Sequence, residues 1–175
     1  MGADGRAFAL FQRRSSSKDT WPGALDVAVG GHLRAGETLA ESLREADEEI
    51  GLVVTLADLT RLGRRFAHSS GGTDNEIQDV FGLRSDLPLD GYRLHPDEVD
   101  GVVALDLEDA IALFDGIRRS VPARELRRGG SSTPTAIDVG VADFAAGEVG
   151  GYAVRALEGL RVIIGGGSPA PFELR

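Results

Sequence analysis

Apolar residues recur at helical spacing in the stretch that leads to Gly51. Leu39, Leu43, Ala46 and Ile50 follow one another at steps of four, three and four residues. This period places them along one side of a helix, in a stripe about a third of the circumference wide. We expect that side to face the core. Gly51 is suited to end the helix, because the residue after a helix often adopts a left-handed conformation that glycine tolerates.

Short runs rich in apolar and β-branched residues, separated by turn signals, predict β-strands elsewhere in the chain. The expected strands are Ala7 to Gln12, Ala24 to Val29, Leu62 to Phe66, Glu76 to Leu83 and Gly101 to Leu107. Asp106 is suited to cap a short helix from Leu107 to Phe114. A closing helix is expected from Tyr152 to Ile164, with Val154, Leu157, Leu160 and Ile164 on one side. This order of strands and helices is compatible with the α/β class.

Two stretches in the C-terminal part are expected to be irregular. Residues Ile117 to Ser132 are basic and Gly-rich and include a proline, which predicts a surface loop with solvated arginines at positions 118, 119, 124 and 127. Residues 165–175 are expected to form a flexible tail. Residues 1–164 would then form a single domain, because 175 residues with 42% hydrophobic content suit one core.

Composition narrows the classes of partner. The net charge of −9 argues against nucleic acid or an anionic membrane surface, because either would be repelled. The chain contains no cysteine, which excludes disulfides, thiolate metal sites and a thiol nucleophile. No uncharged apolar stretch approaches the roughly 18 residues of a membrane span, and the N-terminus does not resemble an export signal. We therefore expect a cytoplasmic protein without a membrane partner.

Three carboxylates share one side of the expected helix. Glu45, Glu48 and Glu49 fall within one arc beside the apolar stripe, because positions i, i+3 and i+4 point the same way. Like charges at this spacing destabilise an isolated helix by roughly 0.2–0.5 kcal/mol per pair. A divalent cation would reverse the sign, and Mg²⁺ binds through a few carboxylates together with substrate phosphate oxygens. The alternative is a solvated acidic helix on the protein surface.

These residues resemble the Nudix box. The run Arg44 to Leu52, READEEIGL, matches its second half, and Gly31 with Glu37 matches its first half, so the box spans residues 31–52. The resemblance implies an α/β/α sandwich with a mixed sheet. It also implies a hydrolase that uses Mg²⁺, which Mn²⁺ can replace, to cleave the diphosphate linkage of a small organic or nucleoside diphosphate derivative. The residues implied in catalysis are Arg44, Glu45, Glu48 and Glu49, with the three glutamates as metal ligands.

The sequence departs from the usual Nudix pattern in two places. Six residues separate Glu37 from Arg44, where the usual box has seven. If the missing residue lies inside the helix, Glu37 turns by about 100°, which puts in question the ion pair that this residue usually makes with Arg44. In addition, the usual first strand has no counterpart before Ala7. A start farther upstream, another segment of this chain or a partner chain could supply it, so a homodimer is left open.

A second resemblance concerns the segment before the box. The run RRSSSKDTWPG, followed by a Gly-His pair, is similar to the isopentenyl diphosphate isomerase branch of the Nudix superfamily. It implies that the basic residues of this run contact a substrate diphosphate; solubilising charges at a strand end are the alternative. Backbone amides of the glycine pair can approach phosphate closely, because no side chain intervenes. The residues expected to bind substrate are Arg13, Arg14, Lys18, Gly30 and Gly31.

The same branch suggests a second set of metal ligands. Asp74 and Glu76 would share one face of a strand, and with His32 they match the acidic residues and the histidine of the isomerase metal site. A packed or hydrogen-bonded role in the loop is an equal alternative for His32. The position of a further catalytic acid falls on Asp97 or Glu98, and the sequence does not distinguish between them.

Proton chemistry argues against the isomerase itself. The isomerase family uses a cysteine directly before the Gly-His pair, and Gly30 occupies that place here, in a chain without cysteine. Hydrolysis needs only a cation that polarises a phosphoryl oxygen and a carboxylate that accepts a proton from water. We therefore expect a hydrolase with a small-molecule diphosphate substrate. The alternative is a non-catalytic Nudix-like module that binds a diphosphate without cleaving it.

Overall fold

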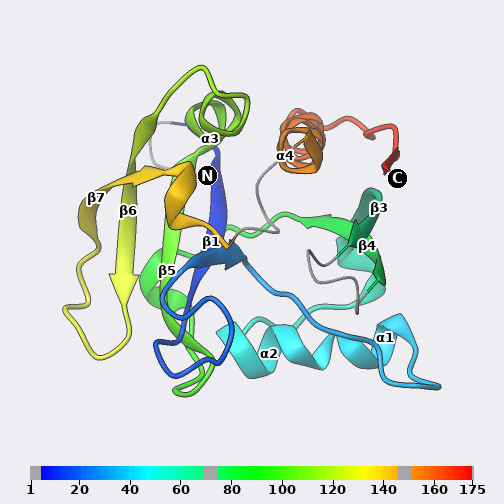
Figure 1. Ribbon diagram of the computed structural model, residues 1–175, viewed down its shortest axis with the longest axis horizontal. Helices are drawn as coiled ribbons and strands as arrows, with labels where there is room; N and C mark the ends of the chain where they lie inside the picture. The colour runs from blue at the N-terminus through cyan, green and yellow to red at the C-terminus, as the bar shows by residue number, and fades with distance from the viewer. Residues whose placement is uncertain (1–4, 69–74, 146–150, 175) are drawn as a thin grey trace.

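The computed structural model describes residues 5–68, 75–145 and 151–174, and it contains two sheets and four helices in those residues (Figure 1). The strands are β1 Phe8–Arg14, β2 Leu25–Val27, β3 Leu59–His68, β4 Asn75–Leu83, β5 Val99–Asp106, β6 Ser120–Arg127, β7 Thr135–Gly140 and β8 Phe172–Leu174. The α-helices are α1 Leu39–Ser42, α2 Arg44–Ile50, α3 Leu107–Phe114 and α4 Gly151–Ile164. Within the described ranges, no helix has the length and apolar character needed to cross a membrane.

The larger sheet has the strand order β2-β1-β5-β6-β7, and every neighbouring pair in it is antiparallel. The smaller sheet has the order β4-β3-β8 and is mixed, because β8 runs parallel to β3. The expected α/β class with a mixed sheet is thus confirmed. The structure adds that the mixed sheet is the smaller of two sheets.

The two faces of the larger sheet meet different helices, because successive side chains of a strand point to opposite faces. Phe11 of β1 faces α3, where its ring lies 6.2 Å from that of Phe114 and 5.1 Å from that of Phe144. Gln12, the next residue, faces the other way and donates a hydrogen bond to Glu49 of α2. The larger sheet therefore lies between α3, on its apolar core side, and α2, on the side where the box carboxylates lie.

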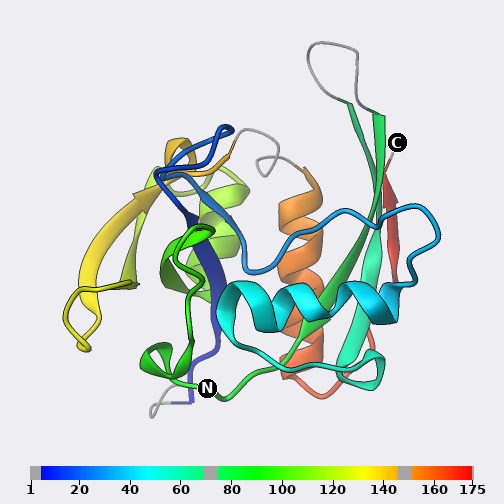
Figure 2. The same ribbon diagram turned by 90° about the horizontal axis from the view of Figure 1, so that it is seen from below.

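Helix α4 connects the two sheets (Figure 2). Leu157 packs into the core that the larger sheet forms with α3. On its other side, α4 covers the smaller sheet so closely that a Cβ atom added to Gly82 of β4 would lie 2.8 Å from Leu160 and Ile163. The predicted closing helix is thus confirmed, with Gly151 added at its beginning. Its position fixes the smaller sheet, and the β4 residues described below, relative to the larger one.

The expected loop from Ile117 to Ser132 is wrong, because β6 occupies residues 120–127. Val121 and Ala123 are buried while Pro122 and Arg124 between them are exposed, which is the alternation of a half-buried strand. The sequence concealed this strand because proline is disfavoured inside sheets. Of the arginines expected to be solvated there, Arg118 pairs with Asp109 at 2.7 Å and Arg127 pairs with Glu125 at 2.9 Å.

The expected flexible tail is also corrected, because its residues 172–174 form β8. Phe172 pairs with Gly63 of β3, and an added Cβ atom at Gly63 would collide with the Phe172 side chain. The smaller sheet thus takes its third strand from the C-terminal segment. A three-residue strand after a run of Gly and Pro gives almost no periodic signal, so only its partner reveals it.

Candidate metal and diphosphate site

Helix α2 buries two apolar residues, Ala46 and Ile50, and the hydrogen bond from Gln12 of β1 to its Glu49 places it against the larger sheet. Gly51 ends it in the left-handed conformation, with φ at 71°. Beyond this end, the chain returns as a loop whose backbone is tied to the last turn: Arg93 N donates to Ile50 O at 3.0 Å, and His95 N donates to Glu49 O at 2.8 Å. These bonds place the loop that leads to Glu98 beside the carboxylates of α2.

Glu49 is a partly buried acidic residue of the box. Its carboxylate accepts a hydrogen bond of 3.2 Å from Gln12, a residue that is only 5% exposed. Burial raises the pKa of Glu49 to about 7; the carboxylates of Glu45 and Glu98 add to this increase, whereas the Gln12 bond and the Lys18 ammonium oppose it. The negative charge at Glu49 is therefore poorly compensated by the protein.

Lys18 and Glu98 form an ion pair next to Glu49. Their two loops are also joined through the backbone, because Ser15 N donates to Glu98 O at 2.9 Å. A further bond of 2.9 Å runs from Ser16 N to a carboxylate oxygen of Asp100. The sequence did not distinguish Asp97 from Glu98 as the further acid. The structure brings Glu98 next to Glu49.

Glu45 lies against the backbone of Gly31. An added Cβ atom at position 31 would overlap the Glu45 carboxylate, so this close approach requires glycine. At Gly30, by contrast, an added Cβ atom would meet only Val27, at 3.3 Å. Of the two glycines, it is therefore Gly31 that makes room for the Glu45 carboxylate.

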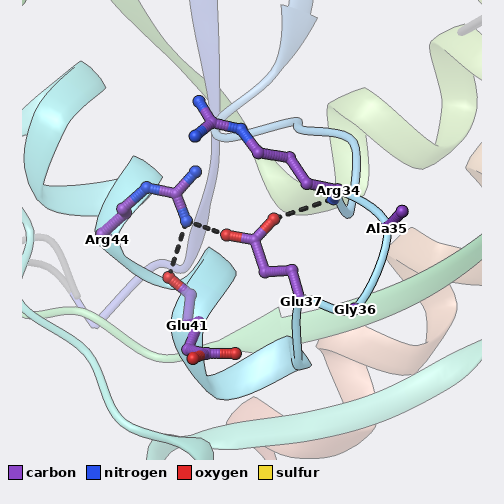
Figure 3. A pocket seen from close by; sticks show the side chains of 6 residues that line it. All are labelled: Arg34, Ala35, Gly36, Glu37, Glu41 and Arg44. Carbon is purple, nitrogen blue, oxygen red and sulfur yellow. Dashed lines mark hydrogen bonds and ion pairs between the residues drawn. The ribbon is translucent and has the colours of Figure 1, made fainter.

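Arg44 joins the two halves of the box (Figure 3). Its guanidinium pairs with Glu37 and donates to Glu41 O at 3.0 Å. The pKa of Glu37 is lowered by the backbone hydrogen bond from Arg34 and by the Arg44 side chain. The hollow drawn in Figure 3 is lined by Arg34, Ala35, Gly36, Glu37, Glu41 and Arg44.

The shortened spacing in the box does not separate Glu37 from Arg44. The expected single helix is interrupted at Leu43, so that α1 and α2 are two elements. Thr38 is the N-cap of helix α1, and its side chain and that of Glu41 cap each other's backbone. Glu37 precedes α1, and it still pairs with Arg44, so the rotation that one continuous helix would impose on Glu37 does not occur.

Glu48 is more exposed than the other two box glutamates. Its side chain is 62% exposed, and its carboxylate lies 3.8 Å from Nε of Arg44. Arg44 also lies 3.6 Å from Glu45. In the segments that the structure describes, no three His, Asp or Glu side chains come close enough together to hold a metal ion.

Two of the arginines expected to bind substrate are engaged within the protein. Arg13 pairs with the buried Glu125 and donates to Gly23 O at 2.9 Å. Arg14 pairs with Asp26 at 2.8 Å and donates to Thr20 O at 3.1 Å. Both therefore hold the loop that follows β1, and Lys18 on that loop is the cation that they position at the site.

His32 and Glu76 meet, as the second set of ligands requires, but they do so as a hydrogen-bonded pair. Nε2 of His32 lies 2.8 Å from Glu76, and Gln78 donates to the other carboxylate oxygen at 2.8 Å. These two bonds, that of Gln78 first, lower the pKa of Glu76. Asp74 lies outside the described residues. The pair links the glycine loop to β4 of the smaller sheet.

The sequence did not point to Gln12, although one signal was available. Gln12 is a polar residue at the end of the apolar run of β1, and it is buried. Buried polar side chains need a partner, and its partner is Glu49, 37 positions away. A buried polar residue of this kind can be assigned to a site only when the element that packs against it is known.

Comparison with known proteins assigns the chain to a family. The NUDIX domain matches residues 1–124. The uncharacterised Nudix hydrolase YfcD of Escherichia coli K12 is 50% identical over 115 residues, which cover 64% of this chain and 59% of YfcD. An isopentenyl-diphosphate Delta-isomerase of an Enterobacter species is 36% identical over 99 residues, 54% of this chain and 51% of that one.

An uncharacterised Nudix hydrolase of Clostridium acetobutylicum is 29% identical over 112 residues, 63% of this chain and 54% of that protein. A crystal structure from Deinococcus radiodurans matches with a TM-score of 0.47 and 31% identity, over 65% of this chain and 67% of that one. The chain thus spans little more than half the length of these curated relatives. Because the family match covers residues 1–124 of 175, the chain belongs to the Nudix family.

Proposed function

We propose that this protein is a hydrolase that cleaves the diphosphate linkage of a small organic or nucleoside diphosphate derivative with the help of Mg²⁺, for which Mn²⁺ can substitute. The observation that carries the proposal is the surroundings of Glu49. The partly buried Glu49 carboxylate lies beside two further carboxylates, Glu45 and Glu98, and burial together with these neighbours raises its pKa to about 7. A cation bound beside Glu49 would compensate its negative charge.

The residues present fit a hard divalent ion. Glu45 and Glu49 offer oxygen ligands, which Mg²⁺ prefers, and substrate phosphate oxygens usually complete its coordination. Gln12 orients Glu49, and Gly31 leaves room for Glu45. When bound, the ion would polarise a phosphoryl oxygen and lower the pKa of the attacking water. The more exposed Glu48 would serve as an outer ligand on the solvent side.

We assign the role of proton acceptor to Glu98. Its side chain is 38% exposed, against 21% for that of Glu45, so water can reach it. Glu98 lies on a loop fixed to both α2 and the loop after β1. A carboxylate held beside the reacting phosphate can accept a proton from water and direct its attack. Lys18, on the same side, would bind the negative charge of the diphosphate.

Hydrolysis is proposed rather than isomerisation, although one relative is named as an isopentenyl-diphosphate Delta-isomerase. Moving a double bond requires a proton donor and a proton acceptor on opposite faces of the substrate. Gly30 stands where that branch places its cysteine, and the chain has no cysteine that could replace it. The lack of a proton-transferring side chain at this position does not affect hydrolysis.

The test is release of phosphate or nucleotide from a panel of diphosphates in the presence of Mg²⁺, with the metal omitted as the control. Turnover of at least one substrate that is lost with Glu49→Gln supports the proposal. Saturable binding of a diphosphate without any release would favour the non-catalytic binding module instead. Undiminished turnover by Glu49→Gln would remove the box from the mechanism.

A further inference from the structure

Lys18 is the single lysine of this chain: the other 18 of its 19 Lys and Arg residues are arginines. The two side chains differ in physical behaviour. Arginine carries a planar, two-pronged guanidinium that suits fixed pairing with carboxylates, whereas lysine carries a compact ammonium on a flexible stem. Arg13 and Arg14, which precede it, make such fixed contacts: they donate hydrogen bonds to the backbone oxygens of Gly23 and Thr20 in the same loop. The one flexible cation lies at the acidic site.

The backbone around Lys18 is fixed, so a change of partner requires only its side chain to move. Ser15 and Ser16 are bonded to Glu98 and Asp100, and Lys18 N donates to Ser15 O at 3.2 Å. The Lys18 and Glu98 side chains are 31% and 38% exposed. Ion pairs with this exposure contribute little to stability, because water screens them. The pair is therefore easily replaced.

We propose that Lys18 is an internal counter-ion of the acidic site, whose ion pair with Glu98 is loosened when a divalent cation binds. This inference rests on the proposed function. The ammonium partly neutralises Glu98, with which it pairs, and Glu49 beside it. A divalent cation bound by Glu45 and Glu49 would offset the charge of both, so that only Glu98 of the three carboxylates still attracts the ammonium, which is then held less strongly.

The exchange has two consequences for the reaction. The released ammonium gains a new partner in the substrate diphosphate, and the Glu98 carboxylate becomes free to accept a proton. In the structure the two groups are engaged with each other. Binding is therefore ordered, with the cation before the diphosphate, and Lys18 acts as a positioning residue that couples the two events.

The presence of one lysine allows a direct measurement. Reductive methylation with ¹³C-formaldehyde keeps the positive charge and labels Lys18, and the amino terminus gives the only other signal. We expect Mg²⁺ to move the Lys18 signal saturably in the wild type. In Glu98→Gln the signal should lie near the displaced position before Mg²⁺ is added. Imidodiphosphate, a non-hydrolysable probe, should move the signal again only when Mg²⁺ is present.

A second measurement uses Mn²⁺ binding in the absence of substrate. Lys18→Met removes the competing cation, so Mn²⁺ should bind about fivefold more tightly, the effect of removing one exposed pair. Arg118→Met is the matched control. It removes one positive charge from an exposed ion pair with Asp109 on α3, away from the carboxylates of α2, and should leave Mn²⁺ affinity unchanged.

The outcomes separate this inference from the proposed function. A Lys18 signal that stays in place while Mn²⁺ or Mg²⁺ binds saturably overturns the exchange and leaves the hydrolase intact. Equal Mn²⁺ affinity in the wild type and Lys18→Met does the same. Complete absence of saturable metal binding overturns both. A shifted signal together with tighter binding by Lys18→Met supports the exchange, even when no substrate of the panel is cleaved.

Discussion

Glu49 and Glu76 are both acidic residues that the sequence suggested as metal ligands, yet they lie in opposite surroundings. Glu49 is enclosed between α2 and the larger sheet, where burial and neighbouring carboxylates raise its pKa to about 7. Glu76 lies on the smaller sheet, where Gln78 and His32 donate to its two oxygens and lower its pKa. The protein leaves one charge uncompensated and satisfies the other.

The difference indicates where a cation would gain most. A divalent ion beside Glu49 relieves repulsion that the fold does not relieve by itself, whereas one beside Glu76 must first displace His32 and Gln78. Acidic residues in a sequence show only where ligands are available. The partners that each carboxylate already has decide which of them needs a metal.

The largest effect is expected from the pair of variants Glu49→Gln and Glu76→Gln. Loss of a metal ligand should lower kcat/KM by more than about 100-fold, which is the upper end of the effect of an outer-shell partner. Glu76→Gln should lower it by less than about tenfold, because the Glu76 carboxylate is already bonded to His32 and Gln78 and is not one of the ligands proposed here. Steady-state kinetics of both variants on one substrate of the panel measure the difference. Equal losses would contradict the comparison.

A smaller loss is expected from Gly31→Ala, which acts through Glu45. The added methyl group would overlap the Glu45 carboxylate and push it out of position, so Mn²⁺ affinity should fall about tenfold, equivalent to about 1.4 kcal/mol. Gly151→Ala is the control, since nothing lies within 4 Å of its added Cβ atom. Isothermal titration with Mn²⁺ checks both. Unchanged affinity in Gly31→Ala would mean that Glu45 does not bind the ion.

The local features of the molecule were accessible from the sequence. Helix α3 begins after Asp106, as predicted, because the signal is contained in three neighbouring residues: the Asp106 carboxylate accepts from Glu108 N at 3.1 Å and Asp109 N at 3.3 Å. The left-handed end of α2 at Gly51 was accessible for the same reason. Such signals depend only on residues a turn apart.

The remaining features depend on residues far apart in the chain. Gln12 and Glu49 meet across 37 positions, and the ion pair of Lys18 with Glu98 joins two loops. No periodic pattern encodes such a contact, because tertiary packing decides it. The helix interruption at Leu43 belongs to the same group: the spacing showed that one residue was missing, but not where the chain would absorb it.

Without metal, Glu49→Gln and Glu76→Gln should change the free energy of unfolding in opposite directions relative to the wild type, and both changes should depend on pH. Because the pKa of Glu49 is raised from 4.5 to about 7, the folded state is most favoured at low pH and loses stability as pH rises through this interval. Glu49→Gln should therefore be more stable than the wild type at pH 8, by about 1–2 kcal/mol once partial exposure is allowed for. This gain should vanish near pH 4.5.

The pKa of Glu76 is lowered, so its contribution is present above its ordinary pKa and is lost as pH falls below that value. Glu76→Gln should be less stable than the wild type at pH 8, by under about 1 kcal/mol because the pair is partly exposed. Urea unfolding of both variants at pH 8 and pH 5, without metal, gives the two signs. A gain in stability for Glu76→Gln would contradict the assignment of compensated and uncompensated charge.

The smallest effect is expected from His32→Gln, which removes the imidazole from the pair with Glu76. The His32 side chain is 83% exposed, so the loss of stability should be under about 0.5 kcal/mol. Mn²⁺ affinity should stay unchanged, since Glu45 and Glu49 keep their positions. Thermal unfolding and isothermal titration with Mn²⁺ measure the two quantities on the same sample. A tenfold loss of Mn²⁺ affinity would instead place His32 among the metal ligands. The contrast between Glu49 and Glu76 would then be wrong, because the partner of Glu76 would itself belong to the metal site.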